Sequence, residues 1–258
     1  MAGSSSNRRD EGGLGARPTR ADVRDRLDRV VDPELDRSIV ELDYVDRIAV
    51  DDGDVEVAFT LPTAWCSPAF AWMMATDSRD EVGSLPGVAS VTIRLRDHMH
   101  GEEITRGVNA RATFESVFPD ADGGVREVRA MLDDKARFAR QHDAVDACLD
   151  AGLTPDQIVG FRRGDVDLTE DGAVVAVDGV HVVVARDPVA HYLEKAGDSG
   201  HVTAADDRLF LTVDGEPIPL DRFETVHKRT RLAGVNMGGQ GAVCDALNES
   251  RRAKLDRD

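Results

Sequence analysis

The sequence predicts an α/β fold of the α+β kind, with a small N-terminal sandwich of order α-β-β-α-β followed by a second, mainly helical domain with short strands. Three observations predict it. Apolar residues recur at helical spacing after Thr19, strict alternation marks strands at residues 55–61 and 91–95, and a long helical pattern covers residues 125–151. Helices packed on one face of a small sheet bury the apolar sides of both, so these patterns favour a layered structure.

The first predicted helix begins after Thr19, a suitable N-cap residue with Asp22 at the third helical position. Apolar residues then recur on one helix face. Pro33 ends the pattern, because the residue before a proline is pushed out of the α region. Residues 1–18 are rich in Gly, Ser and Arg and lack the apolar stretch of a secretory signal. We expect them to form a disordered tail.

The turn after this helix carries two carboxylates, Asp32 and Glu34, which either join a functional site or cap the turn. Two strands follow, joined by a tight hairpin in which Gly53 supplies the positive φ. The expected elements are a helical turn at residues 38–42, strands at 44–50, 55–61 and 91–95, and a helix that starts after Ser67.

Cys66 lies at the turn between the second strand and the helix that follows. Ser67 offers an N-cap oxygen, and Pro68 suits the first helical position. The free N–H groups and the dipole of a helix N-terminus favour a thiolate, which is the form that binds metal or attacks an electrophile. The alternative is a buried cysteine that packs as a small hydrophobic residue.

Composition narrows the classes of function. The net charge of −17 argues against a nucleic-acid partner, because binding phosphates requires a cationic surface. No apolar stretch is long enough to span a membrane. Three cysteines without a CxxC pair fit a reducing cytoplasm. The Asp-rich, Lys-poor composition is typical of a salt-rich cytoplasm, as in halophiles, although a high-GC genome produces the same bias.

Several motifs in one order resemble the small iron–sulfur cluster assembly domain of SufT-type and PaaD-type proteins and of the eukaryotic cytosolic Fe–S targeting factor. The matching stretches are Val31-Asp32-Pro33-Glu34-Leu35, Ser38-Ile39-Val40-Glu41-Leu42, Thr60-Leu61-Pro62-Thr63-Ala64-Trp65-Cys66 and Leu85-Pro86-Gly87-Val88 with the strand after it. The resemblance covers residues from about Thr19 to Asp97.

The resemblance implies that Cys66 is the functional thiol, with Thr63, Asp32 and Glu34 grouped near it. It also implies a transient Fe–S cluster or iron as cargo, and a client apoprotein or other assembly components as partners. The family usually has Gly before the cysteine and Pro after it, whereas this chain has Trp65 and Ser67. Trp65 therefore either shields the thiol or presents a hydrophobic docking surface, and the choice of client is expected to differ.

His98 and His100 follow the third strand and precede two glutamates. Imidazole and carboxylate groups are ligands of Zn²⁺ and Fe²⁺. If the strand continued, both rings would point to the same face, as chelation requires. With Cys66 at the same sheet edge, a mixed Cys/His metal site would follow; exposed histidine pairs in loops without a metal are the alternative.

The expected domain ranges are a tail at residues 1–18, the assembly-type domain at 19–103, a linker at 104–124, and a mixed, mostly helical domain of unassigned role at 125–258. The linker ends in a polar, glycine-rich stretch. The second domain is expected to contain a long helix at 125–151, a short helix after Thr154, a hairpin at 174–184, a helix at 188–195, a strand at 209–211, and helices at 220–232 and 242–255. The glycine-rich stretch at 234–241 is expected to form a mobile loop between these last two helices.

The second region resembles the catalytic domain of tyrosine recombinases. The tracts that carry this likeness are Ala151-Gly152-Leu153-Thr154-Pro155-Asp156-Gln157-Ile158, Asp165-Val166-Asp167-Leu168, Asp207-Arg208-Leu209-Phe210-Leu211-Thr212 and Asp214-Gly215-Glu216-Pro217. Thr154 replaces the expected arginine, no His-x-x-Arg motif follows, and no tyrosine occurs after Tyr192. Because recombination requires a tyrosine nucleophile, the resemblance implies a catalytically empty relative.

Three functions fit these observations. The first is an Fe–S cluster assembly or metalloenzyme maturation factor that binds iron or a cluster through Cys66; a stable cluster would then need a homodimer, a small thiol or the client for its other ligands. The second is an adaptor that contacts clients through Trp65 without metal. The third is a mononuclear metal-binding enzyme that uses His98 and His100. No P-loop is present, so nucleotide is not expected, and the sequence contains no general acid/base constellation.

Overall fold

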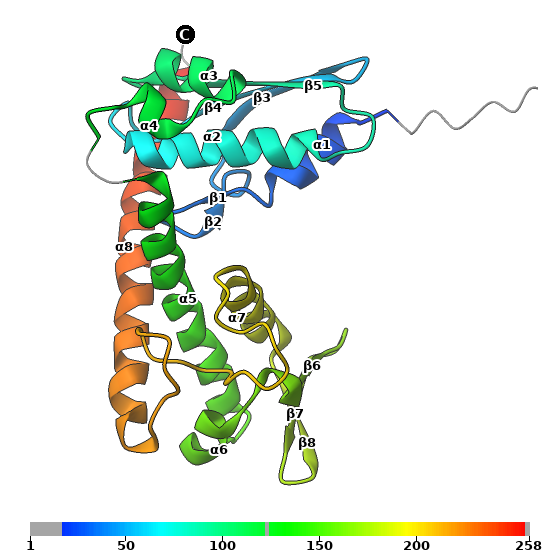
Figure 1. Cartoon of the computed structure of the whole chain (residues 1–258), viewed down its shortest axis with the longest axis vertical. Coiled ribbons are helices and arrows are strands. Elements are labelled where there is room, and N and C mark those ends of the chain that lie inside the picture. The colour runs from blue at the N-terminus through cyan, green and yellow to red at the C-terminus, as the bar shows by residue number, and fades with distance from the viewer. Residues whose placement is uncertain (1–16, 122–123, 256–258) are drawn as a thin grey trace, which may run out of the picture. The chain divides into compact units, whose positions relative to one another are not determined.

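The computed structural model describes residues 17–121 and 124–255, which fold into two compact units (Figure 1). Unit 1 contains the residues up to Asp32 together with Arg37–Pro119, and unit 2 contains Pro33–Asp36 together with the residues from Asp120 onward. Each unit combines helices with a small sheet, which confirms the mixed α/β class. Residues 1–16, most of the expected tail, lie outside the described residues.

Unit 1 holds the predicted α-β-β-α-β order, with a separate two-stranded sheet inserted after the first helix. Its elements are α1 (Arg20–Leu27), β1 (Val31–Asp32), β2 (Arg37–Ser38), β3 (Val45–Asp51), β4 (Asp54–Thr60), α2 (Pro68–Gly83), β5 (Ser90–Arg96), α3 (Gly101–Asn109) and α4 (Phe114–Val117). The capping box at the start of α1 forms as predicted, with the Thr19 N–H donating to Asp22 over 2.8 Å. The expected helical turn is also present, since the Leu42 N–H donates to the Ser38 carbonyl over 2.8 Å.

The central sheet of unit 1 has strand order β3-β4-β5. β3 and β4 form the predicted antiparallel hairpin, in which Gly53 has φ of 93°. β4 and β5 are parallel and are connected through α2, so the chain makes a βαβ crossover. One face carries Val57, Phe59 and Ile93, which are fully buried, and the helices cover this face. The opposite face carries charged residues, among them Glu56 and Arg94, which form an ion pair of 3.1 Å.

Residues 104–119, expected as part of a linker, instead belong to unit 1. Ile104 and Val108 are fully buried on α3, and Phe114 is buried at the start of α4. The Phe114 ring meets Trp72 of α2 edge to face, with ring centroids 5.7 Å apart. Ile104 and Val108 lie at spacing i, i+4 on one face of α3, and Phe114 adds a buried ring from α4, which explains why the segment folds onto α2.

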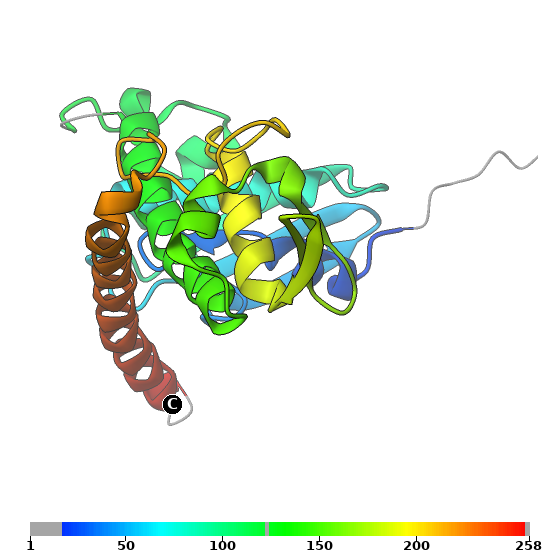
Figure 2. The same ribbon diagram turned by 90° about the horizontal axis from the view of Figure 1, so that it is seen from below.

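Unit 2 is built on a long helix, α5 (Val125–Asp150), which matches the expected helix closely. Its other elements are α6 (Pro155–Gly160), a short 3₁₀ helix at Arg163–Asp165, β6 (Val166–Leu168), β7 (Ala173–Val177), β8 (Val180–Val184), α7 (Arg186–Asp198), a second 3₁₀ helix at Leu220–Arg222 and α8 (Phe223–Leu255). β6, β7 and β8 form an antiparallel sheet, and Asp178-Gly179 makes the predicted β7–β8 turn. α7 and α8 both pack on α5 (Figures 1 and 2).

The glycine-rich stretch at residues 234–241 is helical, so the prediction of a loop between two helices was wrong. α8 runs without interruption through it. Each glycine costs a helix about 1 kcal/mol relative to alanine. Packing on α5 offsets this cost: Met237 is buried, and Gln240 accepts a hydrogen bond of 3.1 Å from Lys135.

The expected strand at residues 209–211 is absent from the described part of unit 2, where Leu211 makes only an isolated bridge. A glutamine side chain takes the place of a neighbouring strand. The amide of Gln141 donates to the Leu211 carbonyl over 2.8 Å and accepts from the Leu211 N–H over 2.9 Å. The Tyr192 hydroxyl adds a hydrogen bond of 3.2 Å to the same amide oxygen. The backbone of Leu211 is therefore paired on both its N–H and its carbonyl by a side chain instead of a strand.

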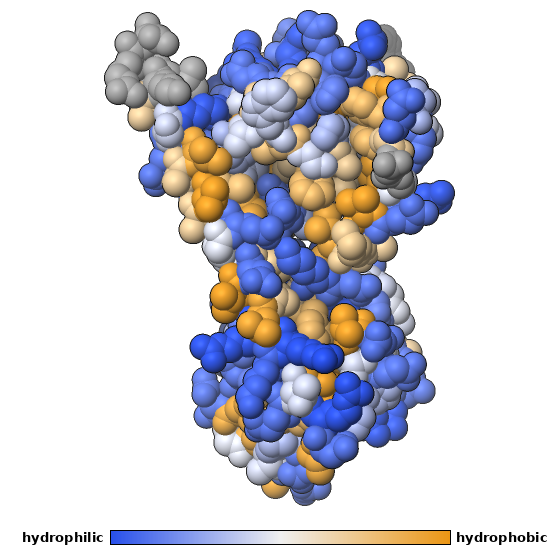
Figure 3. Space-filling view, turned by 90° about the vertical axis from the view of Figure 1, so that its left-hand side faces the viewer, coloured by the Kyte–Doolittle hydropathy of each residue, from blue (hydrophilic) through white to orange (hydrophobic). Residues whose placement is uncertain are grey.

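Hydrophilic side chains cover much of the face drawn in Figure 3, and hydrophobic residues gather in smaller patches. Among the described residues, no helix has the length and apolar character needed to cross a membrane.

Candidate functional site

The loop between β4 and α2 carries Cys66 at the position where the sequence predicts it. Ser67 occupies the N-cap position of α2 and Pro68 the first helical position. The Ser67 hydroxyl, however, makes no capping hydrogen bond, in contrast to the expectation. Cys66 is half-buried and comes directly before the N-cap residue of the helix.

Thr63 organises this loop. Its hydroxyl accepts a hydrogen bond of 2.9 Å from the Trp65 N–H and lies 3.9 Å from the Cys66 sulfur. The Thr63 carbonyl accepts from the Cys66 N–H over 3.4 Å. The structure therefore brings Thr63 and Cys66 together, as the sequence motif implies, and Thr63 is positioned to hydrogen-bond the thiol.

Asp32 is buried in unit 1 and is linked to the same loop through Tyr44. The Tyr44 hydroxyl donates to the Asp32 carboxylate over 3.4 Å, and the Tyr44 carbonyl accepts from the Thr60 N–H over 3.0 Å. Asp32 therefore supports the residue that anchors the start of the cysteine loop. Glu34, in contrast, belongs to the segment Pro33–Asp36, which is part of unit 2. Its carboxylate accepts a hydrogen bond of 3.1 Å from Gln240 of the same unit.

His98 contacts the cysteine loop through a hydrogen bond of its ring. β5 ends at Arg96, and Asp97 has φ of 51°, so the strand that would align both histidines does not continue. The His98 Nδ1 accepts a hydrogen bond of 3.1 Å from the His100 N–H. Its Nε2 lies 2.9 Å from the Cys66 carbonyl and must then be the protonated nitrogen that donates to it.

Both ring nitrogens of His98 are thus used to hold backbone in place. The pKa of His98 is lowered, chiefly because burial disfavours the charged ring, with the neighbouring His100 acting in the same direction. A neutral ring is what the two hydrogen bonds require. The His100 ring packs edge to face on Phe118, with centroids 5.3 Å apart. No local sequence pattern reveals that His98 fixes the Cys66 loop, because the contact joins two separate loops.

The surface around Cys66 is both hydrophobic and charged. Trp65 is 76% exposed and Met99 is 53% exposed, and the Met99 N–H donates to the Ala64 carbonyl over 3.0 Å, which joins their two loops. A hollow of about 1020 Å³ adjoins them on the charged face of the sheet; its lining includes Arg47, Glu56, Arg94, Arg96, Asp97 and Glu102. Trp65 is therefore available to a partner, in agreement with a docking surface.

The other two cysteines belong to unit 2. Cys148 is buried on α5, and burial raises the pKa of its thiol to about 12. It is therefore a protonated, packed thiol at neutral pH. Cys244 lies on α8 and is half-buried.

Comparisons with known proteins gave one family model and two relatives. Residues 20–93 match the family model described as iron–sulfur cluster assembly protein. An iron–sulfur cluster carrier protein of Synechocystis is 25% identical over 173 residues, which cover 66% of this chain and 44% of that protein. An uncharacterized protein of Methanocaldococcus jannaschii is 31% identical over 87 residues, which cover 33% of this chain and 90% of that protein. The chain thus spans less than half the length of the carrier protein. No solved structure matches it significantly.

Proposed function

The chain belongs to the iron–sulfur cluster assembly protein family, and from that membership we propose that its Cys66 thiolate binds iron or an iron–sulfur cluster and passes it to a client apoprotein. The observation that carries the proposal is the position of Cys66. It is the cysteine within the matched residues 20–93, and it lies half-buried on a loop ordered by Thr63 and His98.

The number of ligands indicates transfer instead of storage. A cluster normally takes four protein ligands, and this site offers one thiolate. The remaining ligands must come from a second copy of the chain, from a small thiol or from the client. Such a cluster is held weakly. A client thiolate then displaces the Cys66 thiolate at iron, so that one Fe–S bond forms as another breaks, without a change of oxidation state.

The hydroxyl of Thr63 and the first turn of α2 support this role. The hydroxyl lies 3.9 Å from the sulfur, and Cys66 comes directly before the N-cap of the helix, whose free N–H groups favour anionic ligands. Trp65 adds an exposed aromatic surface next to the thiol, suited to a client whose cysteines lie beside an apolar patch.

Anaerobic reconstitution tests the proposal. The full chain, its Cys66→Ser variant and a Cys244→Ser control are incubated with ferrous iron, sulfide and dithiothreitol, and bound iron and visible absorption are measured after desalting. We expect a thiolate-to-iron charge-transfer band in the wild type and in Cys244→Ser, and its loss in Cys66→Ser. Equal iron and absorption in Cys66→Ser would exclude Cys66 as the carrier.

An adaptor function is the second candidate, favoured by the exposure of Trp65 and Met99. In that case Cys66→Ser keeps client binding, whereas Trp65→Ala weakens it. A mononuclear site on His98 and His100 is the third candidate. It requires His98 to give up one of its two hydrogen bonds, and it predicts stoichiometric metal that His98→Ala or His100→Ala removes while Cys66→Ser retains it.

A further inference from the structure

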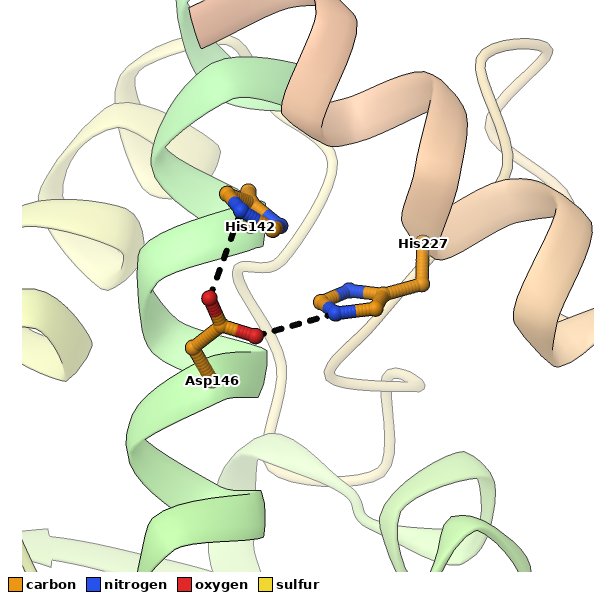
Figure 4. Close-up of side chains that lie close together, drawn as sticks. All are labelled: His142, Asp146 and His227. Carbon is orange, nitrogen blue, oxygen red and sulfur yellow. Dashed lines mark ion pairs between the residues drawn. The ribbon is translucent and has the colours of Figure 1, made fainter.

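Two histidines and an aspartate of unit 2 form a cluster between α5 and α8 (Figure 4). His142 and Asp146 lie one turn apart on α5, and His227 lies in the first turns of α8. The His227 Nε2 is 2.9 Å from Asp146 Oδ1, and the His142 Nε2 is 3.3 Å from Asp146 Oδ2. One candidate ligand atom from each residue lies within 4.8 Å of the others. The three residues can thus each offer one ligand atom to a shared site.

The protein holds this cluster in place from several sides. α5 and α8 pack along each other, and the His142 and His227 rings have centroids 4.7 Å apart. Phe223, one turn before His227, stacks on its ring with an interplanar angle of 15°. The two histidine side chains are only 16% and 19% exposed, whereas Asp146 is 48% exposed. The imidazoles are therefore shielded, and the carboxylate leaves a path from solvent.

Thr230 of α8 lies beside the cluster. Its hydroxyl donates to the His227 carbonyl over 2.7 Å, and the same oxygen lies 3.5 Å from the His142 Nδ1. With a proton on Nδ1, the His142 Nε2 can offer its lone pair to a metal ion. The His142 Nε2 and the Asp146 Oδ2, 3.3 Å apart, are then held together either by a shared cation or by a second proton on the ring.

We propose that His142, Asp146 and His227 bind a divalent transition cation of the Fe²⁺ or Zn²⁺ class. Two imidazoles and one carboxylate are a donor set that both ions accept, and hard Mg²⁺ or Ca²⁺ prefers oxygen ligands. Three protein ligands leave at least one coordination position of the metal for water or an exchangeable ligand. Catalytic metal sites have such an open position, whereas structural sites have all positions filled by protein ligands.

The site is separate from Cys66 and from the family-matched residues 20–93, since all three ligands belong to unit 2. Thr230 supports it by fixing the His142 ring in the orientation that presents Nε2. The sequence offers no spacing motif for it beyond His142 and Asp146 at i, i+4, because the third ligand comes from another helix.

The test is metal binding by the full chain after removal of metal with a chelator. Co²⁺ serves as a spectroscopic probe, because cobalt in a site of low coordination number absorbs strongly in the visible range, and Zn²⁺ is then titrated against it. We expect one Co²⁺ per chain, displaced by Zn²⁺. Asp146→Asn, which keeps the shape of the side chain, and His227→Ala should each weaken binding by about 100-fold or more, since even outer-shell changes cost 10–100-fold.

His191→Ala is the matched control, because this histidine is exposed on α7 of the same unit and outside the cluster. Cys66→Ser separates the result from the proposed carrier function: it should leave the cobalt spectrum unchanged even if it abolishes iron–sulfur binding. Circular dichroism shows that each variant is folded. If the wild-type chain bound no stoichiometric Co²⁺, or if folded Asp146→Asn bound it with the same affinity as the wild type, the proposal would be overturned. The three side chains would then form only an ion pair between protonated histidine and Asp146.

Discussion

Replacing His98 with alanine tests whether this ring fixes the cysteine loop. The change removes two hydrogen bonds, the 2.9 Å bond to the Cys66 carbonyl and the 3.1 Å bond from the His100 N–H. A typical hydrogen bond contributes about 0.5–1.5 kcal/mol net. Both freed backbone groups lie near the surface and can bind water, so the loss should fall in the lower half of the sum, about 1–2 kcal/mol. We expect this loss in the local opening free energy of the loop.

Hydrogen–deuterium exchange measures that opening directly. The Met99 N–H donates to the Ala64 carbonyl across the two loops, so it exchanges only when they separate. Because about 1.4 kcal/mol corresponds to a factor of ten, Met99 should exchange about 5- to 30-fold faster in His98→Ala. The exposed His181 on β8 provides the control, His181→Ala, which should leave Met99 unchanged. Unchanged Met99 protection in His98→Ala would refute the assignment of His98 as the residue that fixes this loop.

Three further predictions concern stability. Gln141→Leu leaves two buried backbone groups of Leu211 unpaired at about 1–3 kcal/mol each, so chemical denaturation should show about 2–6 kcal/mol of destabilisation. A loss below about 1 kcal/mol would contradict this. Gly53→Ala should lower Tm more than Gly179→Ala. Both glycines have positive φ, but a Cβ at Gly53 would lie 2.7 Å from the Gly87 carbonyl oxygen, whereas a Cβ at Gly179 would meet open space. Equal decreases in Tm would exclude the clash at Gly53. The pKa of His98 is lower in the folded chain, so the unfolded chain binds more protons as the pH falls below about 6.5, and the folded chain loses stability there. His98→Ala removes this group and should show a smaller loss of stability with falling pH. An identical pH profile in the variant would rule out this linkage.

Elements whose signals are local could be predicted from the sequence. Thr19 with Asp22 defines the start of α1, and the Asp52-Gly53 turn defines the β3–β4 hairpin, because both depend on residues within a few positions of each other. The same is true of Cys66, which the strand pattern before it and Pro68 after it place at the N-terminus of α2.

Features that depend on tertiary contacts could not be predicted. Eight residues with several glycines lie within α8, which packs on α5 and buries Met237 among them, although the propensity of the segment alone favours a loop. The pattern of residues 209–211 predicts a strand, but the side chain of Gln141 pairs with the backbone of Leu211 in place of a neighbouring strand. In the site, the role of His98 depends on a contact with the Cys66 carbonyl that no sequence spacing encodes.

The central claim is that Cys66 carries iron or a cluster to another protein, and cluster transfer tests it most directly. The reconstituted wild-type chain and Cys66→Ser are mixed anaerobically with the apo form of a four-cysteine ferredoxin, in the presence of a chelator that captures free iron. Formation of the holo-ferredoxin is followed by circular dichroism. We predict transfer from the wild type and none from Cys66→Ser; transfer at equal rate and yield from Cys66→Ser would contradict the account.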